Sequence, residues 1–253
     1  MDESRVIELL VELYDGLDRL GPGDEASTRR ALELCAELPK SPKILDIGSG
    51  TGAQALTLAR ATGGAITATD LMPSFLRTAE ERFEAAGLES QVTTLVADMR
   101  ALPFPDGEFD LIWSEGSLYL MGFDVGLAEW RRFLKPGGYL VVSELSWFTA
   151  EPAEELAEFW EENYPGLRSV EANVAAAGEH GWSVVETFHL PQSAWTQNYF
   201  GPLKERLPQF REANAGDEAA EVVLAMTERE MELYDAYPEQ YGYEFYVLRK
   251  AAD

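Results

Sequence analysis

The chain has 253 residues, with 45 acidic residues against 20 basic ones and a formal net charge of −25. That length allows one large α/β domain or two small ones. The negative field repels phosphate backbones and anionic membranes, which disfavours a nucleic-acid or membrane-surface partner. No apolar run approaches the roughly 18 residues that span a bilayer, and the N-terminus lacks the basic-then-apolar layout of a leader. With the single Cys35, which suits a reducing compartment, this predicts a soluble, cytoplasmic protein.

The first 40 residues are expected to form an N-terminal helical cap. Apolar residues between Val6 and Leu17 recur at the spacing of one helical face, and the Gly-Pro-Gly cluster at residues 21–23 interrupts that helix. A second helix is expected over residues 26–38, because prolines follow it.

Strands and helices then alternate over residues 41–150, the expected cofactor-binding core. Short apolar runs predict strands at residues 44–47, 65–69, 92–96, 109–113 and 139–145, with helices at 53–61, 74–86 and 122–134. Alternation of this length indicates a largely parallel sheet with helices on both faces. The fold class predicted is therefore α/β and Rossmann-like.

Beyond residue 150 the alternation is less regular. Helices are expected at residues 156–164 and 170–178, and strands at 184–190 and 241–249. Residues 191–240, between these two strands, hold two helical patterns and are predicted to be a helical insertion that serves as a lid or a partner surface. We expect residues 1–253 to form a single domain.

A glycine-rich turn joins the first strand to the next helix. Gly48, Gly50 and Gly52 allow positive φ and close approach of a ligand, and the helix N-terminus offers free N–H groups, Ser49 lying between the first two glycines. A plain tight turn is the alternative. Nicotinamide and flavin sites use G-x-G-x-x-G, whereas the third glycine comes one residue early here. Asp46, two positions before the first glycine, would crowd a pyrophosphate but suits an ammonium or sulfonium, which favours S-adenosylmethionine (SAM).

Two further acids end the next two strands. Asp70 is expected to accept hydrogen bonds from ribose hydroxyls, and Asp98 from the adenine amino group, with Leu71 and Met99 packing on the ring faces. Helix capping by Asp70 and a solvated turn at Asp98 are the alternatives. The carboxyl edge of an open α/β sheet is where ligands bind, which supports the ligand-binding interpretation.

At this point the sequence resembles the class I SAM-dependent methyltransferases, in the small-molecule branch that includes the ubiquinone and menaquinone biosynthesis enzymes. The resemblance covers about residues 40–145. Its motifs are Leu45 to Gly52, Asp70, Ala97-Asp98-Met99, Leu102-Pro103-Phe104, Phe109-Asp110-Leu111-Ile112-Trp113 and Leu134-Lys135-Pro136-Gly137-Gly138.

The resemblance implies a seven-stranded sheet of order 3-2-1-4-5-7-6 with the last strand antiparallel, and SAM lying over the ends of strands one to four. In that family the final two strands normally form a hairpin, whereas here residues 191–240 intervene. This difference puts the acceptor pocket in doubt and leaves the cofactor site unaffected.

The fourth strand ends in Ser114-Glu115-Gly116, where this fold meets the methyl group, and Ser114 is a candidate cofactor contact. The Asn/Asp-Pro-Pro-Tyr motif of enzymes that methylate adenine or amide nitrogens is absent there. Glu115 is the leading candidate for a base or an acceptor-orienting group, with a solvated loop glutamate as the alternative. Tyr119 and His189 are weaker catalytic candidates, and a structural histidine is the alternative for His189.

The acceptor pocket is expected to use residues from the cap, the fifth strand and the insertion. Ordinary core packing is the alternative for the aromatic residues, and a pocket they line would suit a flat or apolar acceptor, or a cation held on aromatic faces. The candidates are Tyr14, Glu144, Trp147, Trp195 and Tyr199.

The function predicted is methyl transfer from SAM to a small-molecule acceptor, with S-adenosylhomocysteine (SAH) as the product. The reaction needs mainly alignment and exclusion of water. No metal is expected, because two histidines nine residues apart, without cysteine partners, do not form a metal cluster. An NAD(P)-dependent oxidoreductase and a non-catalytic SAM-binding protein are the alternatives. The sequence predicts neither the acceptor atom nor the oligomeric state.

Overall fold

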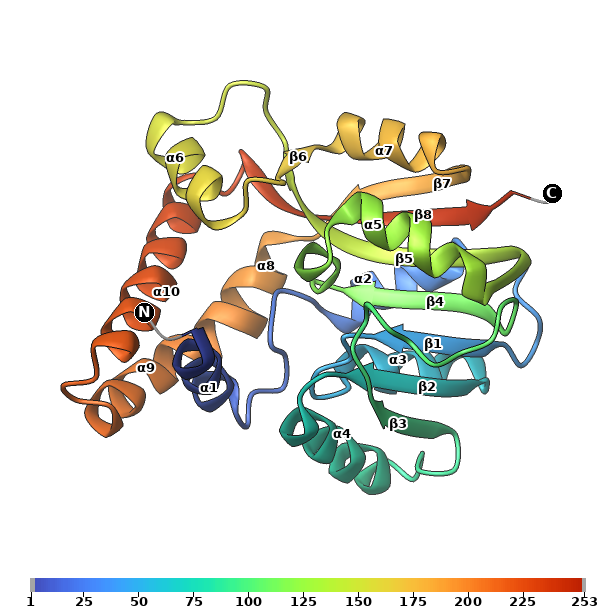
Figure 1. Cartoon of the computed structure of the whole chain (residues 1–253), viewed down its shortest axis with the longest axis horizontal. Helices are drawn as coiled ribbons and strands as arrows, with labels where there is room; N and C mark the ends of the chain where they lie inside the picture. Colours follow the sequence, from blue (N-terminus) through green and yellow to red (C-terminus); the bar gives the residue numbers. More distant parts are fainter. Residues whose placement is uncertain (1–2, 252–253) are drawn as a thin grey trace.

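The computed structural model describes residues 3–251, and over this range an eight-stranded mixed sheet forms the centre of the molecule (Figure 1). The main path of the sheet has the order β3-β2-β1-β4-β5-β8-β7, and the short β6 pairs with β5 outside this path. Without β6, this is the predicted order 3-2-1-4-5-7-6, which is confirmed, as is the antiparallel last strand. The strands are β1 (Lys43–Ile47), β2 (Ala65–Asp70), β3 (Val92–Val96), β4 (Phe109–Glu115), β5 (Leu134–Trp147), β6 (Arg168–Ser169), β7 (Trp182–His189) and β8 (Tyr241–Lys250).

Helices cover both faces of the sheet, because its central strands are apolar on both sides. Along β5, Tyr139 and Val141 pack into one hydrophobic cluster, while Leu140 and Val142 pack into another, as the two-residue period of a strand requires. The first cluster includes residues of α2 (Glu25–Glu33), α3 (Ala53–Thr62) and α4 (Pro73–Ala85). The second includes residues of α5 (Phe123–Trp130) and α7 (Val170–Glu179).

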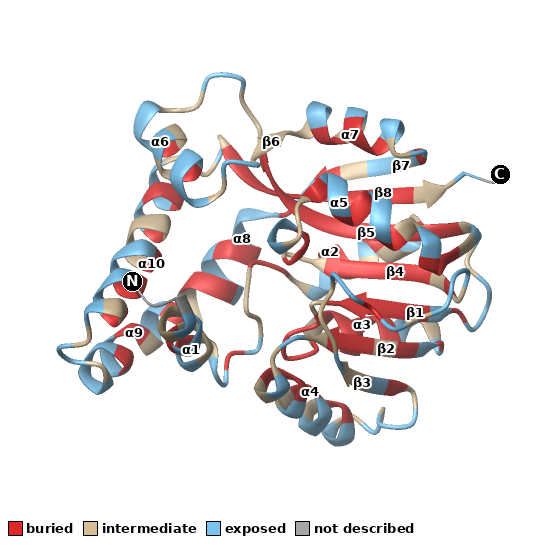
Figure 2. Ribbon diagram, viewed as in Figure 1, coloured by how far each residue is buried: buried red, intermediate tan, exposed pale blue. Residues whose placement is uncertain are grey.

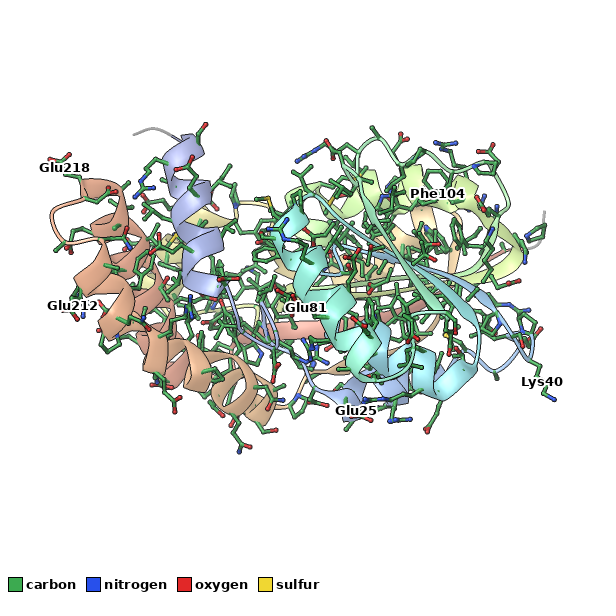
Figure 3. The ribbon with its side chains drawn as sticks, turned by 90° about the horizontal axis from the view of Figure 1, so that it is seen from below. Glu25, Lys40, Glu81, Phe104, Glu212 and Glu218 are labelled. Carbon is green, nitrogen blue, oxygen red and sulfur yellow. The ribbon has the colours of Figure 1, made fainter. Side chains whose placement is uncertain are left out.

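A group of helices stands beyond the carboxyl ends of the parallel strands (Figure 1), and we call it the cap. Helix α1 contacts both α9 and α10, and the Arg5 guanidinium lies 2.9 Å from a carboxylate oxygen of Asp217. Figure 3 shows α1 beside the α9–α10 pair, with side chains filling the space toward the sheet. The cap comprises α1 (Glu3–Tyr14), α6 (Glu154–Asn163), α8 (Gln192–Trp195), η3 (Thr196–Phe200), α9 (Gly201–Ala213) and α10 (Glu218–Ala236).

Buried residues run through the strands and continue along α8, α9 and α10 (Figure 2). The apolar positions of the insertion therefore pack as a core of their own between the cap and the sheet. Trp195, Phe200 and Leu203 all belong to the same cluster as the β5 residues Tyr139 and Val141.

The structure differs from the predicted elements at three places. β5 begins at Leu134, because the expected turn at residues 135–138 continues as strand with an irregular register against β4. The fifth helix ends at Trp130 and a 3-10 turn follows it. The insertion contains four helical segments, α8, η3, α9 and α10, where two patterns were expected. No helix within residues 3–251 has both the length and the apolar character of a membrane span.

Candidate active site

A cavity of about 460 Å³ lies at the carboxyl ends of β1 to β4, within the usual size of small-molecule sites. The loops after these strands form one side, and residues 18–22, which follow α1, lie on the other. The sequence-predicted residues that line the cavity are Tyr14, Gly48, Ser49, Gly50, Asp70, Leu71, Asp98, Met99, Glu115 and Tyr119. The predicted residues outside the lining are Asp46, Gly52, Ser114, Glu144, Trp147, His189, Trp195 and Tyr199.

The glycine loop brings its backbone to the cavity because a side chain would not fit. Gly48 has φ of +68°, and a Cβ there would lie 2.3 Å from the hydroxyl oxygen of Ser117. Such a φ also costs a non-glycine residue energy. The loop is held from below, since the Ser49 N–H donates to the Thr69 carbonyl at 2.9 Å. The exposed wall of the cavity at this point is therefore main chain.

Asp46 is fully buried behind the glycine loop, one residue before the end of β1. One carboxylate oxygen accepts from the Gln54 side-chain amide at 3.3 Å, and the other has no hydrogen-bond partner within residues 3–251. Burial raises the pKa of Asp46 well above its usual range. The buried hydroxyl of Ser49 also lacks a partner within the same residues. Since Ser49 and Gln54 line the cavity, these free polar groups fit a ligand with hydrogen-bond donors and positive charge.

Asp70 organises the loop as well as lining the cavity. Its carboxylate accepts from the Gly50 N–H and the Met72 N–H, both at 2.9 Å, and burial raises its pKa. A carboxylate has about four acceptor positions, so two remain for the hydroxyls of a ribose. Asp98 accepts from the Arg100 N–H at 2.9 Å and keeps a half-exposed carboxylate at the cavity.

Gly52 and Ser114 support the site from behind. A Cβ at Gly52 would lie 2.6 Å from the ring of Phe83, so this glycine allows α3 and α4 to pack closely. The Ser114 hydroxyl lies 2.7 Å from that of Ser117, which in turn donates to the Ile47 carbonyl at 3.1 Å. Ser117 lines the cavity and was missed from the sequence, where no motif marks it.

Glu115 is an anchor between distant segments. Its side chain is 4% exposed, and it accepts from the Arg19 guanidinium at 3.1 Å, the Thr28 hydroxyl at 2.7 Å and the Trp113 indole N–H at 2.9 Å. These three donors occupy both carboxylate oxygens. They also attach the segment after α1, including the cavity residues Arg19 and Leu20, to the end of β4. This role competes with the predicted role of a base.

His189 lies away from the cavity. Its Nδ1 is hydrogen-bonded to the buried carboxylate of Glu244, and its ring stacks on Phe148 with centroids 3.9 Å apart. Trp147 also lies outside the lining and meets Tyr241 edge-on at 6.2 Å.

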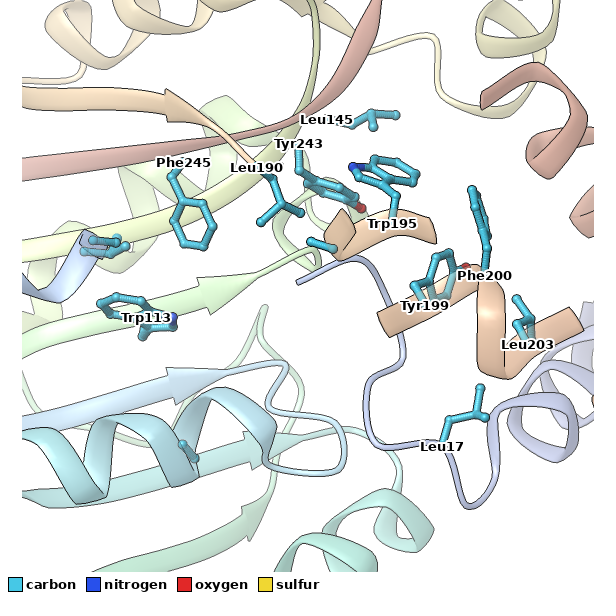
Figure 4. Close-up of a cluster of buried hydrophobic side chains, with 14 of the residues drawn as sticks. Leu17, Trp113, Leu145, Leu190, Trp195, Tyr199, Phe200, Leu203, Tyr243 and Phe245 are labelled. Atoms are coloured by element: carbon cyan, nitrogen blue, oxygen red, sulfur yellow. The ribbon is translucent and has the colours of Figure 1, made fainter. Parts of the chain in front are cut away.

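The aromatic residues of the insertion divide into packing residues and residues near the cavity. Trp195 stacks on Tyr234 with centroids 4.3 Å apart (Figure 4). The Tyr199 hydroxyl lies 2.8 Å from that of Tyr14, which lines the cavity. Glu144 is buried at the end of β5 and accepts from the Tyr164 hydroxyl at 2.6 Å.

Comparison with known proteins agrees with this geometry. Residues 44–138 match the model of the methyltransferase domain. The demethylmenaquinone methyltransferase of Thermus thermophilus is 44% identical over 136 residues, covering 52% of this chain and 60% of that protein. The ubiquinone/menaquinone biosynthesis C-methyltransferase of Psychromonas ingrahamii is 33% identical over 160 residues, covering 62% and 64%. The chain thus spans less than two thirds of the length of these relatives.

A solved structure extends the likeness to the whole chain. The SAM-dependent methyltransferase of Geobacter sulfurreducens, in complex with SAH, superposes with a TM-score of 0.80 and 24% identity, over 95% of this chain and 97% of that one. The fold and the domain match are those of a class I SAM-dependent methyltransferase. Within that class, the chain is similar to the ubiquinone and menaquinone biosynthesis methyltransferases, and the resemblance found in the sequence is confirmed.

Proposed function

We propose that this protein transfers the methyl group of SAM to a small-molecule acceptor. The observation that carries the proposal is the buried Asp46 with a free acceptor oxygen, next to a main-chain wall at Gly48 and Gly50. A buried carboxylate of this kind disfavours a pyrophosphate and favours a ligand with an ammonium or sulfonium group. The dinucleotide alternative therefore has less support.

Residues of the cavity would hold the parts of the cofactor separately. Asp70 has acceptor positions left for ribose hydroxyls, and Asp98 has a half-exposed carboxylate for an adenine amino group. Leu71 and Met99 offer apolar surface beside these acids. Asp46 acts through the Gln54 amide, which lines the cavity while Asp46 itself does not.

When bound, SAM supplies an activated methyl group on a good leaving group. The protein's part is to align the acceptor and to exclude water. Residues 18–22 close one side of the cavity, and Glu115 holds them in place through Arg19. Tyr119 lines the cavity beyond the end of β4 and is placed to touch an acceptor.

We further propose that the reaction takes place in the cytoplasm and does not involve nucleic acid. The single cysteine suits a reducing compartment, and a net charge of −25 repels phosphate backbones.

Calorimetric titration with SAH and with NAD(P) tests the cofactor. We expect SAH to bind, NAD(P) not to bind, and Asp70→Asn to weaken SAH binding by at least tenfold. Asp106→Asn is a matched control, because Asp106 is exposed on a distant turn and pairs only with Arg132. Binding of NAD(P) without SAH would contradict the proposal. Tight SAH binding without transfer of label from SAM to any metabolite fraction would favour the non-catalytic alternative.

A further inference from the structure

A second group of ionisable side chains lies between the cap and the end of the sheet, next to the cofactor cavity. Glu230 comes from α10 and Glu144 from β5, and neither lines the cavity itself. Four tyrosines from four elements accompany them: Tyr14, Tyr119, Tyr199 and Tyr243.

Glu230 has no partner of its own. Within residues 3–251 no hydrogen bond or ion pair compensates its carboxylate, and burial alone raises its pKa to about 7. Its charge raises the pKa of Tyr14, Tyr119 and Tyr199, and also that of Tyr243. Because a Coulomb interaction weakens with distance, Glu230 must lie near all four phenols.

Glu144 approaches the same tyrosines from the sheet. The residue is 1% exposed, one carboxylate oxygen accepts from the Tyr164 hydroxyl, and the other is buried without a partner within residues 3–251. Its charge raises the pKa of Tyr119 and of Tyr243, the two phenols that Glu230 also affects. The two carboxylates therefore flank a common space.

That space adjoins the place where a methyl group would be presented. Tyr119 meets Tyr164 edge-on with centroids 5.8 Å apart, and Tyr119 also lines the cofactor cavity. The Tyr243 hydroxyl lies 3.5 Å from the position of a Cβ on Gly116, another lining residue. The cap closes the far side, since Tyr14 and Tyr199 join their hydroxyls at 2.8 Å.

Two buried acids without cations of their own are costly unless something pays for them. Arg168 is the cation that acts on Glu144, and it is paired with Asp124 at 3.0 Å. A positive group of a ligand would satisfy the free oxygen of Glu144 and the carboxylate of Glu230 together. Phenol rings around it would add cation–π attraction.

We propose that the methyl acceptor carries a cationic amine or quaternary ammonium group, which binds between Glu230 and Glu144 within the ring of tyrosines. This inference rests on the proposed function, because it takes the cofactor cavity to hold SAM. It assigns the recognition of the acceptor to the cap helix α10 and the end of β5.

Binding of simple cations to the SAH-saturated protein tests the proposal. The probes are tetramethylammonium, choline and ethanolamine, and the control ligand is 3,3-dimethylbutan-1-ol, the uncharged isostere of choline. We expect at least one cation to bind at least tenfold more tightly than the isostere in calorimetric titration. Glu230→Gln should weaken that binding at least tenfold, while Glu221→Gln, an exposed position of the same helix, should not change it.

The outcomes separate the two levels of the argument. If SAH binds but the isostere binds as well as every cation, or Glu230→Gln leaves cation binding unchanged, the acceptor proposal is overturned and the methyltransferase proposal stands. If SAH itself does not bind to the wild-type protein, the proposed function fails. Should Glu230→Gln not fold, Glu144→Gln serves as the second variant, with the same expected loss of cation binding.

Discussion

Replacing Glu115 by glutamine distinguishes an anchoring residue from a base. The substitution keeps the shape of the side chain and an oxygen that can accept from Thr28 and Trp113, but it removes the charge opposite Arg19. The Arg19 side chain is 12% exposed and the Glu115 side chain 4%, so the remaining guanidinium would be a nearly buried, unpaired cation.

The expected loss of stability follows from that burial. Breaking a buried ion pair by removing one partner costs about 3–5 kcal/mol. For a chain of this size each kcal/mol lowers Tm by about 2–4 °C, so Tm should fall by about 6–20 °C. Because Arg19 and Leu20 line the cofactor cavity, the looser segment should also raise the KM for SAM, with a smaller effect on kcat.

Thermal unfolding and steady-state kinetics of labelled methyl transfer measure both effects. The matched control is Glu129→Gln, an exposed glutamate of α5, which should change Tm by less than about 2 °C. A kcat that falls more than a hundredfold with Tm and the KM for SAM unchanged would refute the anchoring role. It would show instead that Glu115 acts on the reacting atoms.

Three further outcomes are expected. Gly48→Ala should weaken SAH binding at least tenfold by calorimetry, since φ of +68° and the close Ser117 hydroxyl oppose any side chain there. Gly52→Ala should lower Tm more than it weakens SAH binding, because the new methyl group would meet the Phe83 ring outside the cavity. Burial raises the pKa of Glu144 to about 8, above the value of about 4.3 for a free glutamate, so its contribution to stability is lost as pH rises between these values. Glu144→Gln should therefore gain Tm relative to the wild type between pH 5 and pH 8.5, measured by scanning fluorimetry.

The cofactor side of the site could be predicted because its information is local in the chain. Asp46, the glycine loop, Asp70 and Asp98 each follow a strand directly, and parallel strands bring their carboxyl ends to one edge. A strand–turn–helix pattern is therefore enough to place these residues together.

The acceptor side could not be predicted in this way. Glu115 meets Arg19 across 96 positions of the chain, and Tyr14 meets Tyr199 across 185. Such pairs depend on how the cap packs on the sheet, which neither periodicity nor spacing encodes. Glu230 in particular looks like any other acid on an amphipathic helix, and only its position facing four phenols distinguishes it.

The place of β8 in the sheet bears on the order in which the protein is assembled. β8 lies between β5 and β7, so the neighbour of β7 arrives more than fifty positions later, after the whole of residues 190–240. Until then β5 and β7 both present unpaired edges, which are open to pairing with other chains. Closing so large a loop is slow compared with forming the local helices within it. We therefore expect the insertion to become helical before the sheet is complete, and conditions that delay β8 to promote aggregation during synthesis.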